Sequence, residues 1–102
     1  MRVIAVDDET KALNVLKSAI NEAIPKTDAR YYKDPSEALY DVENGFVPDV
    51  AFLDIEMPEI SGVALAAKLK KACPNMNVIF VTAYTGYAME ALQLRASGYL
   101  IK

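Results

Sequence analysis

The sequence predicts an α/β fold, a doubly wound five-stranded parallel sheet with helices on both faces. Short β-rich apolar runs alternate with segments whose apolar residues recur three and four positions apart, so strands and helices should alternate along the chain. The runs that begin at Val3, Val50 and Val78 are apolar on consecutive residues, which is typical of strands covered on both sides. With 102 residues, 53% of them hydrophobic, the chain is long enough for one domain with a single core.

The expected strands are short and are separated by the helical segments. They are Val3–Val6, Ala29–Tyr32, Val50–Leu53, Val78–Val81 and Tyr99–Ile101. The second run continues into a more polar stretch, Arg30-Tyr31-Tyr32-Lys33, so this strand should lie at an edge of the sheet. The last strand should also lie at an edge.

The helical segments are recognised by apolar residues on one face. The groups are Leu13, Leu16, Ile20 and Ile24; Ala38, Leu39 and Val42; Leu65, Ala66 and Leu69; and a weaker pattern from Ala88 to Leu94. The run Asp34-Pro35-Ser36-Glu37 predicts the start of the second helix, and Asn44-Gly45 predicts its end. Pro25 and Pro74 should close the first and third helices.

The composition excludes several classes of function. Without histidine the chain can form no Ser-His or Cys-His nucleophile pair, and with Cys73 as its single cysteine it can form no internal disulfide and has too few ligands for a structural zinc site. A free thiol fits a reducing compartment, the cytoplasm. The net charge is −3 and the basic residues are scattered, so we expect no direct contact with nucleic acid. No apolar run approaches the length of a membrane span, and we expect neither membrane association nor a secretion signal.

Polar residues follow the predicted strands at their carboxyl ends. Asp7-Asp8-Glu9 follow the first strand, Asp54 follows the third, Thr82 ends the fourth, and Lys102 follows the fifth. Parallel strands end at the same edge of a sheet, which is where such sheets bind ligands. Carboxylates held together at this edge repel one another, and proteins tolerate this where a cation or a function compensates.

These residue types favour phosphoryl chemistry assisted by Mg2+. Oxygen ligands of high negative charge suit a hard divalent ion, and a carboxylate beside it can act as the nucleophile toward a phosphoryl group. Transfer mainly requires positioning and neutralisation of the phosphoryl oxygens, to which the ammonium of Lys102 and the hydroxyl of Thr82 can contribute. We therefore expect Asp54 to be the acceptor, in a loop shaped by Pro58 and Gly62.

The chain resembles the receiver domain of bacterial two-component response regulators. The matching segments are VDDE at residues 6–9, FLDIEMPEISG at 52–62, VTAY at 81–84 and GYLIK at 98–102. The resemblance implies a flavodoxin-like sheet with strand order 2-1-3-4-5. It also implies a role for each matching residue: Asp54 as phosphorylation site and Mg2+ ligand, Asp8 as direct Mg2+ ligand, Asp7 as ligand through water, the main-chain carbonyl of Glu56 as a further ligand, Thr82 and Tyr99 as a conformational switch pair, and Lys102 as the lysine that contacts the phosphate.

The resemblance also implies partners. The phosphoryl donor must come in trans, from a histidine kinase, because the chain has no histidine. The run Tyr87-Ala88-Met89-Glu90-Ala91, followed by Gly-Tyr-Leu-x-Lys, resembles regulators that couple a receiver to a LytTR-type DNA-binding output domain. Receivers usually continue into a fifth helix, so residues 1–102 are expected to be one receiver domain that lacks its final helix. The surface this leaves uncovered predicts a homodimer.

Other functions compete with this one. A phosphatase of the haloacid dehalogenase type also uses an aspartate and Mg2+, but it places its nucleophile after the first strand with a second aspartate two residues on. Here Asp7 and Asp8 are adjacent and Glu9 fills the third place. A flavodoxin-like cofactor binder would need phosphate donors where the first loop is acidic, and no Gly-rich nucleotide loop is present. The last alternative is an interaction module that acts without phosphorylation, and the complete acidic set argues against it.

Overall fold

The computed structural model describes residues 1–83 and 96–102, and the described elements alternate between strand and helix. They are, in chain order, β1 (Arg2–Val6), α1 (Thr10–Ala23), β2 (Asp28–Tyr32), α2 (Pro35–Glu43), β3 (Val50–Leu53), α3 (Gly62–Ala72), β4 (Asn77–Thr82) and β5 (Gly98–Ile101). Every predicted strand is confirmed, and all but β3 begin one residue earlier than the apolar pattern indicates. The weak helical pattern from Ala88 to Leu94 lies outside the described residues.

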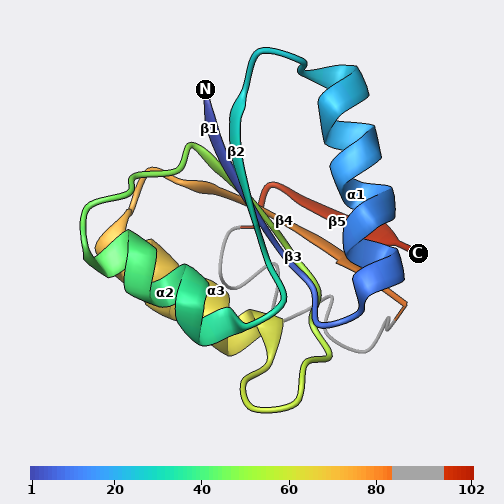
Figure 1. Ribbon diagram of the computed structural model, residues 1–102. Coiled ribbons are helices and arrows are strands. Elements are labelled where there is room, and N and C mark those ends of the chain that lie inside the picture. Colours follow the sequence, from blue (N-terminus) through green and yellow to red (C-terminus); the bar gives the residue numbers. More distant parts are fainter. Residues whose placement is uncertain (84–95) are drawn as a thin grey trace.

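The strands form one parallel sheet in the order β2-β1-β3-β4-β5. Helix α1 covers one face, and α2 and α3 lie together on the other, so the sheet is covered from both sides (Figure 1). The predicted doubly wound fold and its strand order are thus confirmed. β2 and β5 occupy the two edges, also as predicted.

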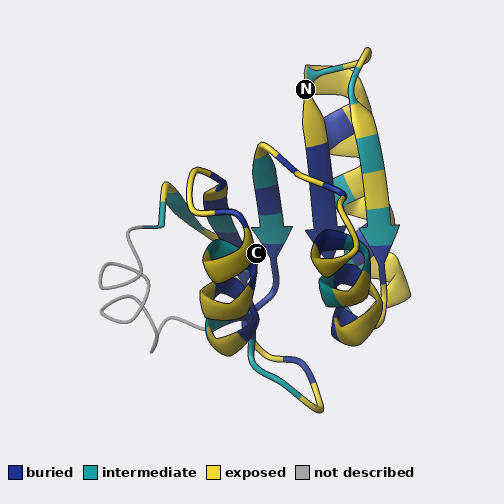
Figure 2. Ribbon diagram, turned by 90° about the vertical axis from the view of Figure 1, so that its left-hand side faces the viewer, coloured by how far each residue is buried: buried dark blue, intermediate teal, exposed yellow. Residues whose placement is uncertain are grey.

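Burial follows this layering (Figure 2). Val3 to Val6 of β1 are completely buried, because this strand lies inside the sheet and is covered on both faces. The larger core lies on the α2 and α3 side and includes Leu53, Leu65 and Phe80. A smaller core lies under α1 and is built around Leu13 and Ile20. The consecutive apolar residues of β1 therefore supply both cores from alternate positions.

Local signals explain where the helices begin and end. The Asp34 carboxylate accepts a hydrogen bond from the backbone N–H of Ser36 and caps α2, whose first residue is a proline. α2 ends at Glu43, and the following Gly45 has φ 109°, a left-handed conformation that glycine adopts readily. The predicted start and end of this helix are confirmed. Among the described residues, no helix is long and apolar enough to span a membrane.

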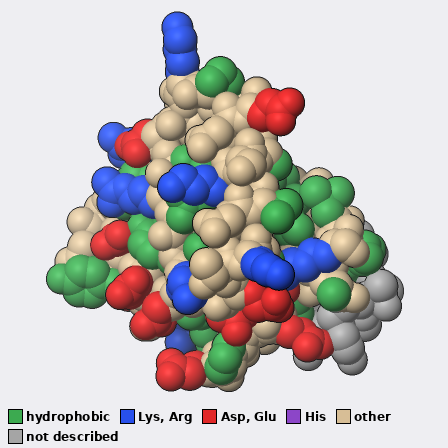
Figure 3. All heavy atoms as spheres, turned by 45° about the vertical axis from the view of Figure 1, so that its right-hand side comes forward, with side chains coloured by type: hydrophobic (Ala, Val, Ile, Leu, Met, Phe, Trp, Pro, Cys, Tyr) green, Lys and Arg blue, Asp and Glu red, His purple; other side chains and the backbone are tan. Residues whose placement is uncertain are grey.

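An apolar groove separates α1 from the β5 edge of the sheet. It has a volume of about 590 Å³, and Asp7 and Lys102 lie at its polar end. Its lining includes exposed apolar side chains, namely Val15 on α1 and Leu100 and Ile101 on β5. Figure 3 shows apolar side chains on this side of the molecule, while acidic side chains gather in the lower part of the view.

Candidate functional site

The sheet register brings the acidic residues of two strands together. Val6 of β1 pairs with Leu53 of β3, so the next residues, Asp7 and Asp54, leave neighbouring strands at the same level. The backbone N–H of Asp54 donates to the carbonyl of Val6 at 3.0 Å, which extends the hydrogen-bond ladder to Asp54 itself. The backbone N–H of Asp7 donates to the carbonyl of Tyr32 at 3.1 Å. The candidate site is therefore built on the ends of regular strands.

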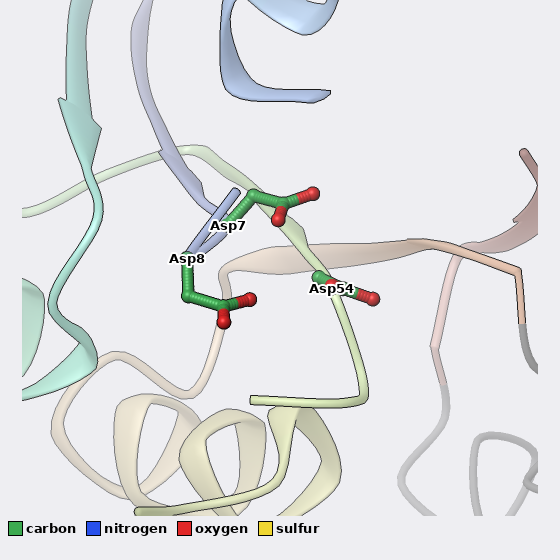
Figure 4. Close-up of side chains that lie close together, drawn as sticks. All are labelled: Asp7, Asp8 and Asp54. Atoms are coloured by element: carbon green, nitrogen blue, oxygen red, sulfur yellow. The ribbon is translucent and has the colours of Figure 1, made fainter. Parts of the chain in front are cut away.

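Asp7, Asp8 and Asp54 converge at this edge. Each offers a carboxylate oxygen, and these oxygens all lie within 4.8 Å of one another. Figure 4 shows Asp7 and Asp8 extending from the loop after β1 toward Asp54, which lies just beyond β3. Asp7 is 2% and Asp54 5% exposed, whereas Asp8 is partly open to solvent. The predicted carboxylate cluster thus exists, and Asp8 is its solvent-facing member.

Lys102 supplies the positive charge of the site. Its Nζ lies 2.7 Å from Oδ2 of Asp7 and 3.4 Å from Oδ2 of Asp54. The backbone N–H of Lys102 donates to the carbonyl of Thr82 at 2.9 Å, which fixes the end of β5 against the end of β4. The shorter contact with Asp7 is the stronger one, since N⁺–H···O⁻ bonds are typically 2.7–2.9 Å long.

Burial and the opposite charge of the partner shift the pKa values of Asp7 and Lys102 in opposite directions. Burial raises the pKa of Asp7 above its ordinary value and outweighs the opposing effects of Lys102 and of the Glu9 backbone N–H, while the charge of Asp54 adds to the upward shift. Burial alone would lower the pKa of Lys102, but the hydrogen bonds and charges of Asp7 and Asp54 outweigh it and raise that pKa. The ammonium is therefore held in its charged form, and the free energy of the site includes a cost for keeping Asp7 ionised.

The donor set fits a hard divalent cation. The three carboxylates and the one ammonium carry a formal charge of −2, and all the candidate ligands are oxygen atoms. Mg2+ prefers oxygen ligands and usually takes one or two carboxylates while it keeps several waters. A solvent-facing Asp8 beside the buried Asp54 leaves room for such waters. The residues present therefore match the predicted magnesium site.

Glu56 lies in the loop that follows Asp54. It lines a shallow depression together with Asp8, Ile55, Met57, Pro58 and Ser61. Its side chain is exposed. The depression adjoins the carboxylate cluster through Asp8, so the Glu56 segment lies beside the proposed cation position. The role of its main-chain carbonyl stays a prediction.

Thr82 and Tyr99 lie on the neighbouring strands β4 and β5. Thr82 is 1% exposed and ends β4 at the same edge as Asp54. Tyr99 is partly buried, and its ring packs against that of Phe80 with centroids 6.2 Å apart and planes tilted by 56°. Tyr99 is therefore separated from the acidic cluster by the strand β4, and its part in a switch stays a prediction.

Sequence reasoning missed how the loop after Asp54 is closed. The Ser61 hydroxyl accepts a hydrogen bond from the backbone N–H of Ala64 and caps α3. The backbone N–H of Gly62 donates to the carbonyl of Ile55 at 2.7 Å and closes the loop. Serine directly before an apolar helical pattern is a helix-start signal, and it was available in the sequence.

Comparison with known proteins identifies the family. A family model described as the response regulator receiver domain matches residues 3–102. The chain belongs to this family. A response regulatory protein of Yersinia pestis is 39% identical over the whole of this chain, which spans 42% of that relative. The transcriptional regulatory protein LytR of Staphylococcus aureus is 33% identical over the whole chain, which spans 41% of it.

A solved structure supports the same assignment. The response regulator protein TrrA of Thermotoga maritima, crystallised in complex with Mg2+ and BeF, has a TM-score of 0.84 and 32% sequence identity. The match covers 99% of this chain and 85% of the TrrA chain. The receiver-domain match extends from β1 to Lys102 and so favours a signalling domain over the phosphatase and flavin-binding alternatives.

Mg2+ should stabilise this receiver domain against thermal unfolding. A ligand that binds only the folded state adds about 2.7 kcal/mol at a hundred times its dissociation constant. In Asp8→Asn the magnesium effect should shrink, and the metal-free protein should melt at a higher temperature because one of the repelling charges is gone. Melting curves with and without millimolar MgCl2 measure both effects.

Asp28→Asn is the matched control. Asp28 is an exposed aspartate that begins β2, at the opposite end of the strands from the cluster. The Asp28→Asn variant should have the melting temperature of the wild type and the same response to Mg2+. If the melting temperature of the wild type does not change when Mg2+ is added, the proposed metal site is contradicted.

Proposed function

We propose that this receiver domain accepts a phosphoryl group on Asp54, with Mg2+ held by Asp54, Asp8 and the main-chain carbonyl of Glu56, and through water by Asp7. The observation that carries the proposal is the convergence of three carboxylate oxygens within 4.8 Å, next to Lys102, at the carboxyl edge of the sheet. A structural role alone gives no reason to bury Asp7 and Asp54 together, because their charges repel.

The side chains divide the work of the transfer. An Oδ of Asp54 attacks phosphorus while the bond to the donor nitrogen or oxygen breaks, and the donor leaves with that electron pair. Lys102, already 3.4 Å from Asp54, can neutralise one oxygen of the incoming group, and the Thr82 hydroxyl can donate to another. Mg2+ would supply charge neutralisation of the phosphoryl oxygens and orientation of the reacting groups.

The donor and the output lie outside these residues. The chain has no histidine, so we propose that a histidine kinase supplies the phosphoryl group in trans. We place this exchange in the cytoplasm, which suits the unpaired Cys73 thiol. The chain spans about two fifths of the curated relatives it matches, and one of these is named a transcriptional regulator. We therefore propose that it is the receiver part of a longer regulator whose LytTR-type domain, and not this one, contacts DNA.

Asp54→Asn should abolish phosphorylation. Incubation of the wild type with Mg2+ and acetyl phosphate should add one phosphate, visible by intact mass and removed by hydroxylamine, as expected for an aspartyl phosphate. Asp28→Asn should be labelled at the wild-type rate. A hydroxylamine-labile phosphate that persists in Asp54→Asn would show that another carboxylate is the acceptor.

We propose that Thr82 and Tyr99 transmit the modification. On phosphorylation the Thr82 hydroxyl would turn toward the phosphate and free space into which the Tyr99 ring can rotate. A charge-assisted hydrogen bond is worth roughly 1.5–3 kcal/mol, enough to shift a nearly balanced population of two ring positions. Backbone pairing of Phe80 with Tyr99, and of Thr82 with Ile101, keeps the two residues on adjoining strands throughout.

Thr82→Ala should leave phosphorylation largely intact but uncouple it from Tyr99. Fluorotyrosine placed at position 99 should report the ring environment by fluorine NMR. Its resonance should move when BeF3⁻ and Mg2+ are added to the wild type or to the control Thr27→Ala, but not when they are added to Thr82→Ala. An unchanged resonance in the phosphorylated wild type would contradict this route.

We also propose that residues 1–102 associate with a second copy through the groove between α1 and β5. Val15, Leu100 and Ile101 are 71%, 54% and 55% exposed and line one continuous depression. Burial of apolar surface contributes about 25 cal/mol per Å², so several hundred Å² would give on the order of 10 kcal/mol before the entropy cost of association.

Light scattering should therefore show a dimer for the 102-residue chain. Val15→Lys should shift it toward monomer because the substitution places a charge in the groove. Tyr40→Lys alters a similarly exposed side chain, 66% exposed on α2 across the sheet, and should not. A chain extended by a following helix should also be less prone to this pairing. A well-folded monomer of the 102-residue chain at high concentration would overturn the proposal.

A further inference from the structure

Gly62, the first residue of α3, lies against the backbone of the acceptor. A Cβ at this position would overlap the carbonyl oxygen of Asp54, and it would lie 2.8 Å from the carbonyl carbon of Asp54 and 2.9 Å from the Cα of Ile55. Real Cβ atoms do not approach backbone atoms so closely. The φ angle of Gly62 is outside the left-handed region, so it is space, not backbone conformation, that requires glycine here.

Neither α3 nor the backbone of Asp54 and Ile55 can move apart freely to make room for a side chain at residue 62. On the α3 side, the helix is capped by Ser61 and anchored in the core by Leu65 and Leu69, which are 1% and 0% exposed. On the other side, the backbone N–H of Asp54 is bonded to β1, and Ile55 is fully buried. The bond from Gly62 N–H to the Ile55 carbonyl links the two sides. A side chain at residue 62 would therefore push on the short segment 54–56.

That segment carries the acceptor. Asp54 contributes its carboxylate to the cluster with Asp7 and Asp8, and its Oδ2 lies 3.4 Å from Lys102. Glu56, whose carbonyl is the proposed further ligand, lies two residues beyond. Displacement of this backbone would move the nucleophile relative to the cation ligands and Lys102, and misplacement by about 1 Å can cost on the order of 10²-fold in rate.

We infer that Gly62 is a positioning residue for phosphoryl acceptance. Because it has no side chain, α3 can pack directly on the Asp54 backbone, and this packing holds the acceptor carboxylate next to Asp8 and Lys102. The inference rests on the proposed function of Asp54. Another glycine gives the contrast. A Cβ on Gly98 would lie 3.4 Å from a side-chain carbon of Ile79, an ordinary contact.

Gly62→Ala and Gly98→Ala test the inference, since both make the same chemical change. Both variants are first checked by circular dichroism, and phosphorylation is followed at a temperature where they are folded. In Gly62→Ala the maximal rate with saturating acetyl phosphate should fall by about tenfold or more, with the half-saturating donor concentration little changed. The Mg2+-induced rise in melting temperature should shrink as well. Gly98→Ala should stay within about twofold of wild type in rate.

The outcomes separate the inference from the function on which it rests. A wild-type rate in Gly62→Ala, or an equal loss in both variants, would overturn the positioning role and leave Asp54 phosphorylation standing. A wild-type chain that takes no phosphate would overturn the proposed function and this inference with it.

A measurement on the wild type covers the case in which Gly62→Ala does not fold. The chain has four glycines, so labelling with ¹⁵N-glycine gives four amide signals. Labelling of serine carbonyls with ¹³C marks the two glycines that follow serine, Gly62 and Gly98, and the Gly98→Ala spectrum tells them apart. Addition of Mg2+ and BeF3⁻ should shift the Gly62 signal more than that of Gly98 and slow its hydrogen exchange. A Gly62 signal that does not respond would overturn the inference.

Discussion

The structure depends on three carboxylates at the carboxyl edge of the sheet, which are brought together by backbone pairing and balanced by one lysine. Asp7 and Asp54 are almost fully buried, and Lys102 contacts both. Neutralisation is incomplete, because the four groups carry a formal charge of −2. The fold therefore holds a site that becomes more stable when it gains positive charge, and a divalent cation is the simplest source.

Lys102 connects the carboxylate cluster to β5, the edge strand of the sheet. The lysine follows β5, its backbone is bonded to Thr82 at the end of β4, and its ammonium contacts residues that follow β1 and β3. A charge change at Asp54 would thus act on the ends of β4 and β5 through direct contacts. Tyr99 lies on β5, the strand that this lysine follows, with its ring against Phe80. The proposed route from acceptor to surface therefore needs no long chain of intermediaries.

Much of the fold could be predicted because its signals are local. Consecutive apolar residues mark strands buried on both faces, and Asp34-Pro35 and Asn44-Gly45 bracket α2 where the structure places its ends. The meeting of Asp7, Asp8 and Asp54 also follows from the sequence, because parallel strands share one carboxyl edge. The preference of Lys102 for Asp7 over Asp54, and the approach of Gly62 to the Asp54 backbone, could not be predicted. Both depend on small differences in distance between segments that lie far apart in the chain or across a loop.

The closer contact between Lys102 and Asp7 bears on how the site prepares for reaction. In the proposed reaction, an ammonium bound tightly to Asp54 would lower the nucleophilicity of its carboxylate before the donor arrives. In the structure the lysine instead makes its 2.7 Å bond to Asp7, whose burial raises its pKa, and only a 3.4 Å contact to Asp54. Asp54 is thereby the less tightly paired of the two carboxylates, while the lysine is already within reach of the oxygens of a phosphoryl group that approaches Asp54. The same contact that offsets the cost of burying Asp7 thus leaves Asp54, the proposed nucleophile, available.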